Sequence, residues 1–132
     1  MINDDDRKAL IKYRMKQAED TIELAKFLAL NQKSAVAVNR IYYGMYYALT
    51  SLALKFKFET SKHGQLIGWF NQEFIAKGTV DPQFGKILRN AFQGRTKGDY
   101  DAFVEFSQGE IETMLTEMEM FIAEVKRLTS LP

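Results

Sequence analysis

The chain has 132 residues and a net charge of +1. This length fits one domain spanning residues 1–132. It contains no cysteine and one histidine, His63, which excludes disulfides, thiol catalysis, cysteine-ligated zinc and a metal site built from several histidines. Because it has an acidic start and no run of about 18 apolar residues, we expect a cytoplasmic protein without a membrane segment, metal or cofactor.

Apolar residues at helical spacing begin close to the N-terminus. They predict a first helix over about residues 4–31, with acidic residues at the end where the helix dipole favours anions. The polar stretch NQKS interrupts this pattern, and Ser34 can cap a second helix that runs to about residue 56. A third helix is predicted over residues 63–77, ending at Gly78.

Two further helices are predicted in the second half of the chain. Asp81 is placed to cap the fourth helix with Pro82 in its first turn, and the glycines of residues 94–98 predict its end. Ser107 and Glu110 have the spacing of a capping box, and one apolar stripe follows over residues 111–128. With no strand-like alternation, the sequence predicts an all-α, up-and-down bundle of about five helices.

Charge is unevenly distributed along the chain. Ten basic and four acidic residues between positions 33 and 100 give that segment a net charge of +6. Residues 101–132 carry two basic and seven acidic residues, for a net charge of −5. Two interpretations fit: an uneven but solvated surface, or a middle segment that faces an anionic partner.

The segment NRIYYGMYYALT, residues 39–50, places four tyrosines and an arginine on the second helix. At 100° per residue, Tyr42 and Tyr46 flank the apolar side, whereas Arg40, Tyr43 and Tyr47 share the opposite face. That face is too apolar for open solvent and too polar for an ordinary core. It fits a buried cluster that orients helices, the seam of a homodimer, or a wall that binds an anionic ligand.

A second unusual segment, FQGRTKGDYDAF, covers residues 92–103. Arg95 continues an inward stripe of the fourth helix, and Asp99 can pair with it. One interpretation is a cation that stabilises the end of a helix. The other is a phosphate-binding site in which Arg95 joins Arg40, Asp99 holds Arg95, and Tyr43, Tyr47 and Tyr100 offer hydroxyls or ring faces.

Three stretches together resemble the HEPN family, named for higher-eukaryote and prokaryote nucleotide-binding domains. They are RIYYGMYYAL, SKHGQLIGWFNQEFIAKG and RTKGDYDAF, and the resemblance covers about residues 5–128. It implies a five-helix bundle that forms a homodimer and often works beside a minimal nucleotidyltransferase. Many members are ribonuclease toxins that cleave RNA without metal, using an arginine, four to six residues, and then a histidine.

The chain departs from that motif at the histidine. Arg95 matches the arginine, but after four intervening residues the position holds Tyr100. A tyrosine with the ordinary pKa of about 10 is only about one-thousandth ionised at pH 7, so it makes a poor general base. His63 can supply the missing imidazole only if the fold brings it to Arg95; otherwise we expect it to cap a helix or make a local hydrogen bond.

Three functions follow from these observations. The missing histidine favours a dimeric binding module for RNA, a nucleotide or a nucleotidyltransferase partner within a toxin–antitoxin type of system. The family and the basic middle segment favour a metal-independent endoribonuclease in which Arg95 acts with His63 or Tyr100. A third reading is a structural interaction domain, in which the arginines and tyrosines only join helices or subunits.

Overall fold

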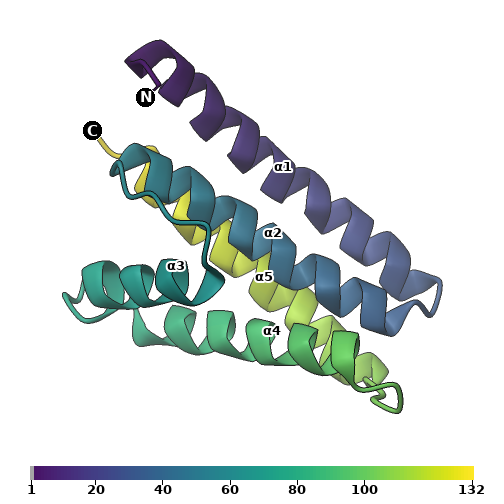
Figure 1. The fold of residues 1–132 in the computed structure, drawn as a ribbon. Coiled ribbons are helices and arrows are strands. Elements are labelled where there is room, and N and C mark those ends of the chain that lie inside the picture. Colours follow the sequence, from purple (N-terminus) through teal and green to yellow (C-terminus); the bar gives the residue numbers. More distant parts are fainter. Residues whose placement is uncertain (1) are drawn as a thin grey trace.

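The computed structural model describes residues 2–132, and within them it contains five α-helices and no strand: α1 (Asp4–Leu30), α2 (Ser34–Lys55), α3 (His63–Phe70), α4 (Pro82–Tyr100) and α5 (Gln108–Thr129). After α3 the chain continues in a short π-helical segment, η1 (Asn71–Ile75). The start of α1 and the end of α5 lie at the same end of the molecule (Figure 1). The all-α bundle predicted from the sequence is confirmed.

α2 is the central helix, and it packs against α1, α3, α4 and α5. Its apolar face is fully covered, since Val38, Ile41 and Leu52 are 0% exposed. Tyr42 lies beside them and is 1% exposed, whereas Tyr46 is only partly buried. Burial of such side chains contributes about 1.5–3 kcal/mol each, so α2 organises the core and fixes which of its faces remains accessible.

Two of the helix caps predicted from the sequence are present in the structure, and a third is not. Asp81 accepts a hydrogen bond from the backbone N–H of Gln83, and Ser107 forms a complete capping box with Glu110. The prediction that Ser34 caps α2 is wrong. Ser34 is the first helical residue, and Lys33 occupies the capping position without a side-chain hydrogen bond to the helix.

The third and fourth helices differ from the predicted ranges. The regular α3 ends at Phe70 and continues in η1, and Gly78 takes a φ of 78° a few residues later. α4 does not end within residues 94–98 but runs on to Tyr100. A Cβ on Gly94 would lie 3.2 Å from the side chains of Met114 and Val38, so this glycine allows close packing, whereas a Cβ on Gly98 would make only ordinary contacts.

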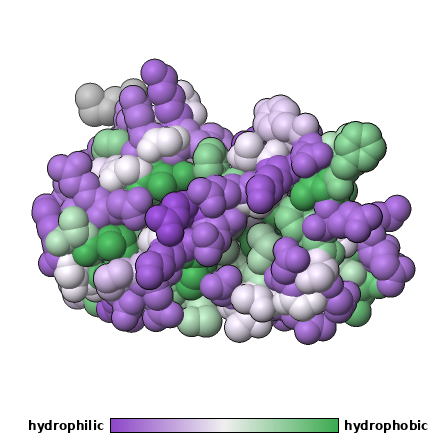
Figure 2. Space-filling view, turned by 90° about the horizontal axis from the view of Figure 1, so that it is seen from below, coloured by the Kyte–Doolittle hydropathy of each residue, from purple (hydrophilic) through white to green (hydrophobic). Residues whose placement is uncertain are grey.

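The surface seen from below Figure 1 is mostly hydrophilic, with separate apolar areas between the polar side chains (Figure 2). Within residues 2–132, none of the helices is long and apolar enough to cross a bilayer. The large apolar side chains that do remain exposed include Phe27, Leu30, Tyr100 and Phe103.

Candidate anion-binding site

The two segments singled out in the sequence meet where the first half of α2 packs against the last turns of α4. Five side chains gather there, and we call them the arginine cluster: Asn39, Arg40, Tyr43, Arg95 and Asp99. An unbroken series of polar contacts joins the two arginines through the other three residues. The fold therefore brings together two cations that lie 55 positions apart in the sequence.

Arg95 is held on three sides. Its Nε atom lies 3.0 Å from Oδ2 of Asp99, one helical turn further on, although that N–H is not aligned for a hydrogen bond. Its Nη2 donates to the Tyr43 hydroxyl at 3.2 Å, and the guanidinium carbon lies 5.5 Å from the centre of the Tyr43 ring. The Arg95 side chain is 20% exposed, and the neighbouring carboxylate offsets part of the cost of burying its charge.

Arg40 has no such compensation. Its Nε and Nη2 donate to Oδ1 of Asn39 at 3.0 and 2.7 Å, and its guanidinium carbon lies 4.9 Å from the centre of the Tyr43 ring. Within residues 2–132 no carboxylate forms an ion pair with it, because Asp99 contacts Asn39 and Arg95 instead. A half-buried guanidinium with spare N–H groups beside an aromatic ring is a natural position for an anion.

Two residues predicted for this site lie outside the arginine cluster. The Tyr47 ring centre is 6.1 Å from that of Tyr43, one turn further from the arginines. Tyr100 is 79% exposed, and five residues of helix rotate it by about 140° away from Arg95. Because α4 continues through Tyr100, this phenol does not converge on the arginine within one chain.

His63 is neither an exposed cap nor isolated. It is the first residue of α3, and its ring stacks on Tyr46 with centres 4.2 Å apart and planes at 11°. Its Nδ1 lies 2.7 Å from the buried Tyr42 hydroxyl. Burial lowers the pKa of His63, and the positive charge of Arg95 lowers it further, so the imidazole is neutral near pH 7.

The hydrogen bond between Tyr42 and His63 Nδ1 limits where the proton of this neutral ring can lie, since either partner can donate. Burial raises the pKa of Tyr42, so its hydroxyl keeps its proton, and His63 Nδ1 is its one hydrogen-bond partner within residues 2–132. If the hydroxyl donates to Nδ1, the ring carries its own proton on Nε2. In this arrangement neither ring nitrogen is free to accept a proton, which argues against a general-base role for His63.

The lowered pKa of His63 predicts a pH dependence of stability. The unfolded chain takes up a proton on this imidazole near its ordinary pKa of 6.5, before the folded chain does. The free energy of unfolding should therefore fall as the pH is lowered from about 7.5 to about 5.5. Urea unfolding at both pH values would measure this change, which should be smaller in His63→Gln; equal changes in the two proteins would contradict the prediction.

Sequence reasoning missed two contributors to this region. Asn39 bridges Arg40 and Asp99, but the helical wheel places it next to the tyrosine face rather than on it. Tyr46 flanks the apolar side of α2 as expected and packs partly buried against the core, but no signal in the sequence shows that it also lines a neighbouring cavity. In the sequence, only the position of Asn39 at the polar start of the segment NRIYYG indicates that it can belong to the site.

Comparison with known proteins agrees with this arrangement of helices and motifs. The HEPN domain model matches residues 11–128, which includes the arginine cluster, α3 and most of α1 and α5. The chain belongs to the HEPN family. The matched range includes Arg95 and the exposed Tyr100 at the end of α4.

Relatives of this HEPN chain come from both bacteria and archaea. A UPF0332 protein of Thermotoga maritima is 32% identical over 123 residues, covering 93% of each chain. A protein of Methanocaldococcus jannaschii named "Putative toxin MJ0142" is 29% identical over 113 residues, covering 86% of this chain and 77% of its own length. A second protein of that organism, "Putative toxin MJ0605", is also 29% identical, over 110 residues.

Proposed function

We propose that this HEPN chain is a toxin-associated module that binds phosphate groups of RNA or of a nucleotide through Arg40 and Arg95. The observation that carries the proposal is the unequal pairing of the two arginines. Asp99 compensates Arg95, whereas Arg40 has an amide oxygen and an aromatic ring but no carboxylate. The names of the archaeal relatives support the association with toxins.

The geometry favours a phosphate over a carboxylate-rich protein surface as the bound group. The Tyr43 ring contacts both arginines but is only partly buried, so a base or ribose can lie against its open surface while a phosphate meets Arg40. Stacking of a base on an aromatic side chain is worth about 1–3 kcal/mol and tolerates any sequence. Single-stranded RNA offers both groups at once, which makes it the first ligand to test.

Titration of a fluorescently labelled single-stranded RNA over a range of salt concentrations tests the proposal. Affinity should fall as salt rises, with a slope of roughly −0.7 in log–log form for each phosphate contacted. Arg40→Ala should weaken binding and reduce that slope by about one such unit. Arg89→Ala is the matched control, because Arg89 is an exposed arginine of α4 outside the arginine cluster.

The assembly state and the partner belong to the same proposal. HEPN membership supports a homodimer, and the resemblance to toxin-associated members supports a minimal nucleotidyltransferase as the protein partner. A stable dimer should bury about 1,600 Å² in total. Sedimentation should show a dimer at micromolar concentration, and a monomer up to millimolar concentration would contradict this part of the proposal.

A metal-independent endoribonuclease is the second candidate function. One observation favours it: the His63 ring centre lies 5.6 Å, and the Arg95 guanidinium carbon 6.0 Å, from the centre of the same Tyr42 ring. The hydrogen bond between Tyr42 and His63 Nδ1 weighs against it. Inducible expression of wild type and Arg95→Ala in a bacterial host decides this point, since only an active nuclease should fragment total RNA.

A further inference from the structure

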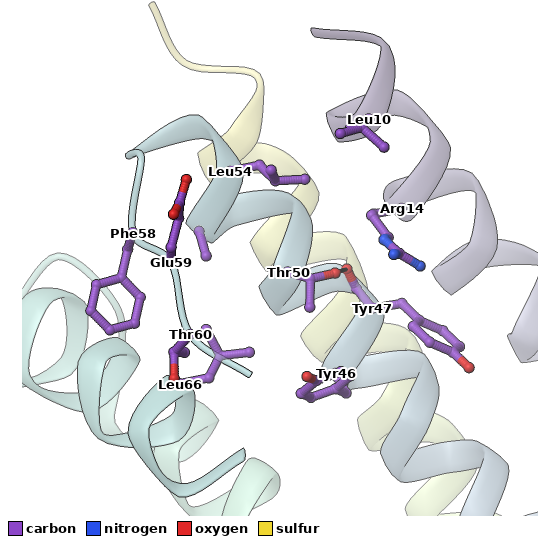
Figure 3. Close-up of a pocket in the computed structure, with 11 residues that line it drawn as sticks. Leu10, Arg14, Tyr46, Tyr47, Thr50, Leu54, Phe58, Glu59, Thr60 and Leu66 are labelled. Atoms are coloured by element: carbon purple, nitrogen blue, oxygen red, sulfur yellow. Dashed lines mark hydrogen bonds between the residues drawn. The ribbon is translucent and has the colours of Figure 1, made fainter. Parts of the chain in front are cut away.

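A separate cavity of about 340 Å³ opens between the N-terminal half of α1, the second half of α2 and the loop that leads into α3 (Figure 3). This volume is at the low end of the roughly 300–1,000 Å³ typical of small-molecule sites. Tyr47 lies on its wall, and the ring of Tyr47 is 6.1 Å from that of Tyr43. The cavity is therefore next to the arginine cluster but does not include either of its arginines.

Two polar side chains that line this cavity, Arg14 and Tyr46, have unused hydrogen-bond donors within residues 2–132. Arg14 reaches from α1 toward Tyr47 on α2 (Figure 3), and its only hydrogen bond within residues 2–132 is from Nη1 to Gln17 at 2.9 Å. No carboxylate in that part of the chain pairs with Arg14. The Tyr46 hydroxyl likewise has no hydrogen-bond partner in the same range, although Arg14 is near enough to act on it electrostatically.

Two features hold Tyr46 ready as a donor. The stacked imidazole of His63 covers one of its faces, so the orientation of the ring is fixed before any ligand arrives. Burial raises the pKa of Tyr46, so the hydroxyl keeps its proton at neutral pH. The cavity therefore offers two kinds of donor to the oxygen atoms of a ligand, a guanidinium on α1 and a phenol on α2.

The other residues that line the cavity determine which kind of ligand it can accept. Most of the other lining side chains are apolar: Leu10, Ala53, Leu54, Phe58 and Leu66. Glu59 also lines the cavity from the loop, and no cation within residues 2–132 forms an ion pair with it. An apolar body fits between the cation on α1 and the carboxylate on the loop, and a second negative charge beside Glu59 would be repelled.

We propose that this cavity binds a small organic oxyanion, with its anionic group on Arg14 and the Tyr46 hydroxyl and its apolar or aromatic body on the leucines. The anion is a carboxylate or a phosphate monoester, since both offer oxygen atoms that match a guanidinium. The proposal does not depend on RNA binding at the arginine cluster, because no residue is shared between the two sites.

Calorimetric titration with phenyl phosphate, benzoate and inorganic phosphate tests the site and separates the two kinds of anion. At least one of the two organic anions should bind, and inorganic phosphate should bind at least about tenfold more weakly because it leaves the apolar wall uncovered. No binding of either organic anion, or equal binding of inorganic phosphate, would overturn the proposal.

Matched variants identify the residues responsible. Arg14→Gln should weaken binding of the organic anion by about tenfold or more, and Tyr46→Phe by about fivefold, because each removes one donor. Lys16→Gln is the charge control, since this exposed lysine of α1 pairs with Asp20 and does not line the cavity. Arg89→Ala, an exposed residue outside both sites, should leave the affinity unchanged. Loss of binding in Arg40→Ala together with full binding in Arg14→Gln would show that the anion occupies the arginine cluster instead.

Discussion

Replacing Arg40 and Arg95 together by alanine should lower the affinity for single-stranded RNA by at least about 100-fold. A hydrogen bond to a charged group contributes about 1.5–3 kcal/mol, and the guanidinium carbons of Arg40 and Arg95 lie 4.9 and 5.5 Å from the centre of the same Tyr43 ring. The double variant removes both cations that can neutralise phosphate in the arginine cluster. It should also lose most of the salt dependence of binding, because fewer counterions are released.

Arg95→Lys tests whether RNA binding needs the planar shape of the guanidinium in addition to its positive charge. Lysine keeps the positive charge but loses the planar group that contacts Asp99 and the Tyr43 hydroxyl at the same time, so binding should still weaken. Circular dichroism of each variant controls for unfolding. If wild type and the folded double variant bind RNA and ATP equally, the arginines are structural and the binding proposal is wrong.

Phe121→Ala should lower the free energy of unfolding by about 3–5 kcal/mol, because it removes a large side chain from the core. Phe121 on α5 is 0% exposed. Its ring centre lies 5.6 Å from that of Phe70 at the end of α3 and 6.4 Å from that of Phe84 on α4. The resulting cavity would loosen the two helices that carry His63 and Arg95.

Urea unfolding of Phe121→Ala and Phe121→Leu measures this contribution. The leucine variant leaves a smaller cavity and should lie between wild type and the alanine variant. A domain of this size has about 5–15 kcal/mol of total stability, so the alanine variant should also lose RNA binding at a lower temperature than wild type. A loss below about 1 kcal/mol in the alanine variant would show that α3 and α4 do not depend on this contact.

Local sequence signals were enough for the architecture of this protein. The apolar stripes of α1, α2 and α5 repeat every three to four residues. Such a periodicity predicts a helix whatever the details of side-chain packing. Capping was equally local: Asp81 and Ser107 bond to backbone groups two or three residues away, so their roles follow from spacing alone. The pairing of Arg95 with Asp99 also follows from spacing, since both lie on one helix, one turn apart.

The positions that sequence reasoning misjudged depend on neighbours distant in the chain. Gly94 and Gly98 predict a helix end, but α4 continues through both of them and turns Tyr100 away from Arg95, while Gly94 makes room for Met114. His63 stands at the start of a helix, where a local cap was the simplest expectation. Only the packing of α3 on α2 places it between Tyr42 and Tyr46, more than 15 residues away.

The sequence by itself determined the all-α fold, the family and the residue types from which an anion site is built. Only the tertiary structure decided which arginine has a carboxylate, which tyrosines face a cavity, and that the histidine is bound through Nδ1. The physical reason is the range of the interactions. Helix formation and capping act over a few neighbouring residues, whereas the pairing and burial of charges depend on side chains that the fold brings together from separate helices.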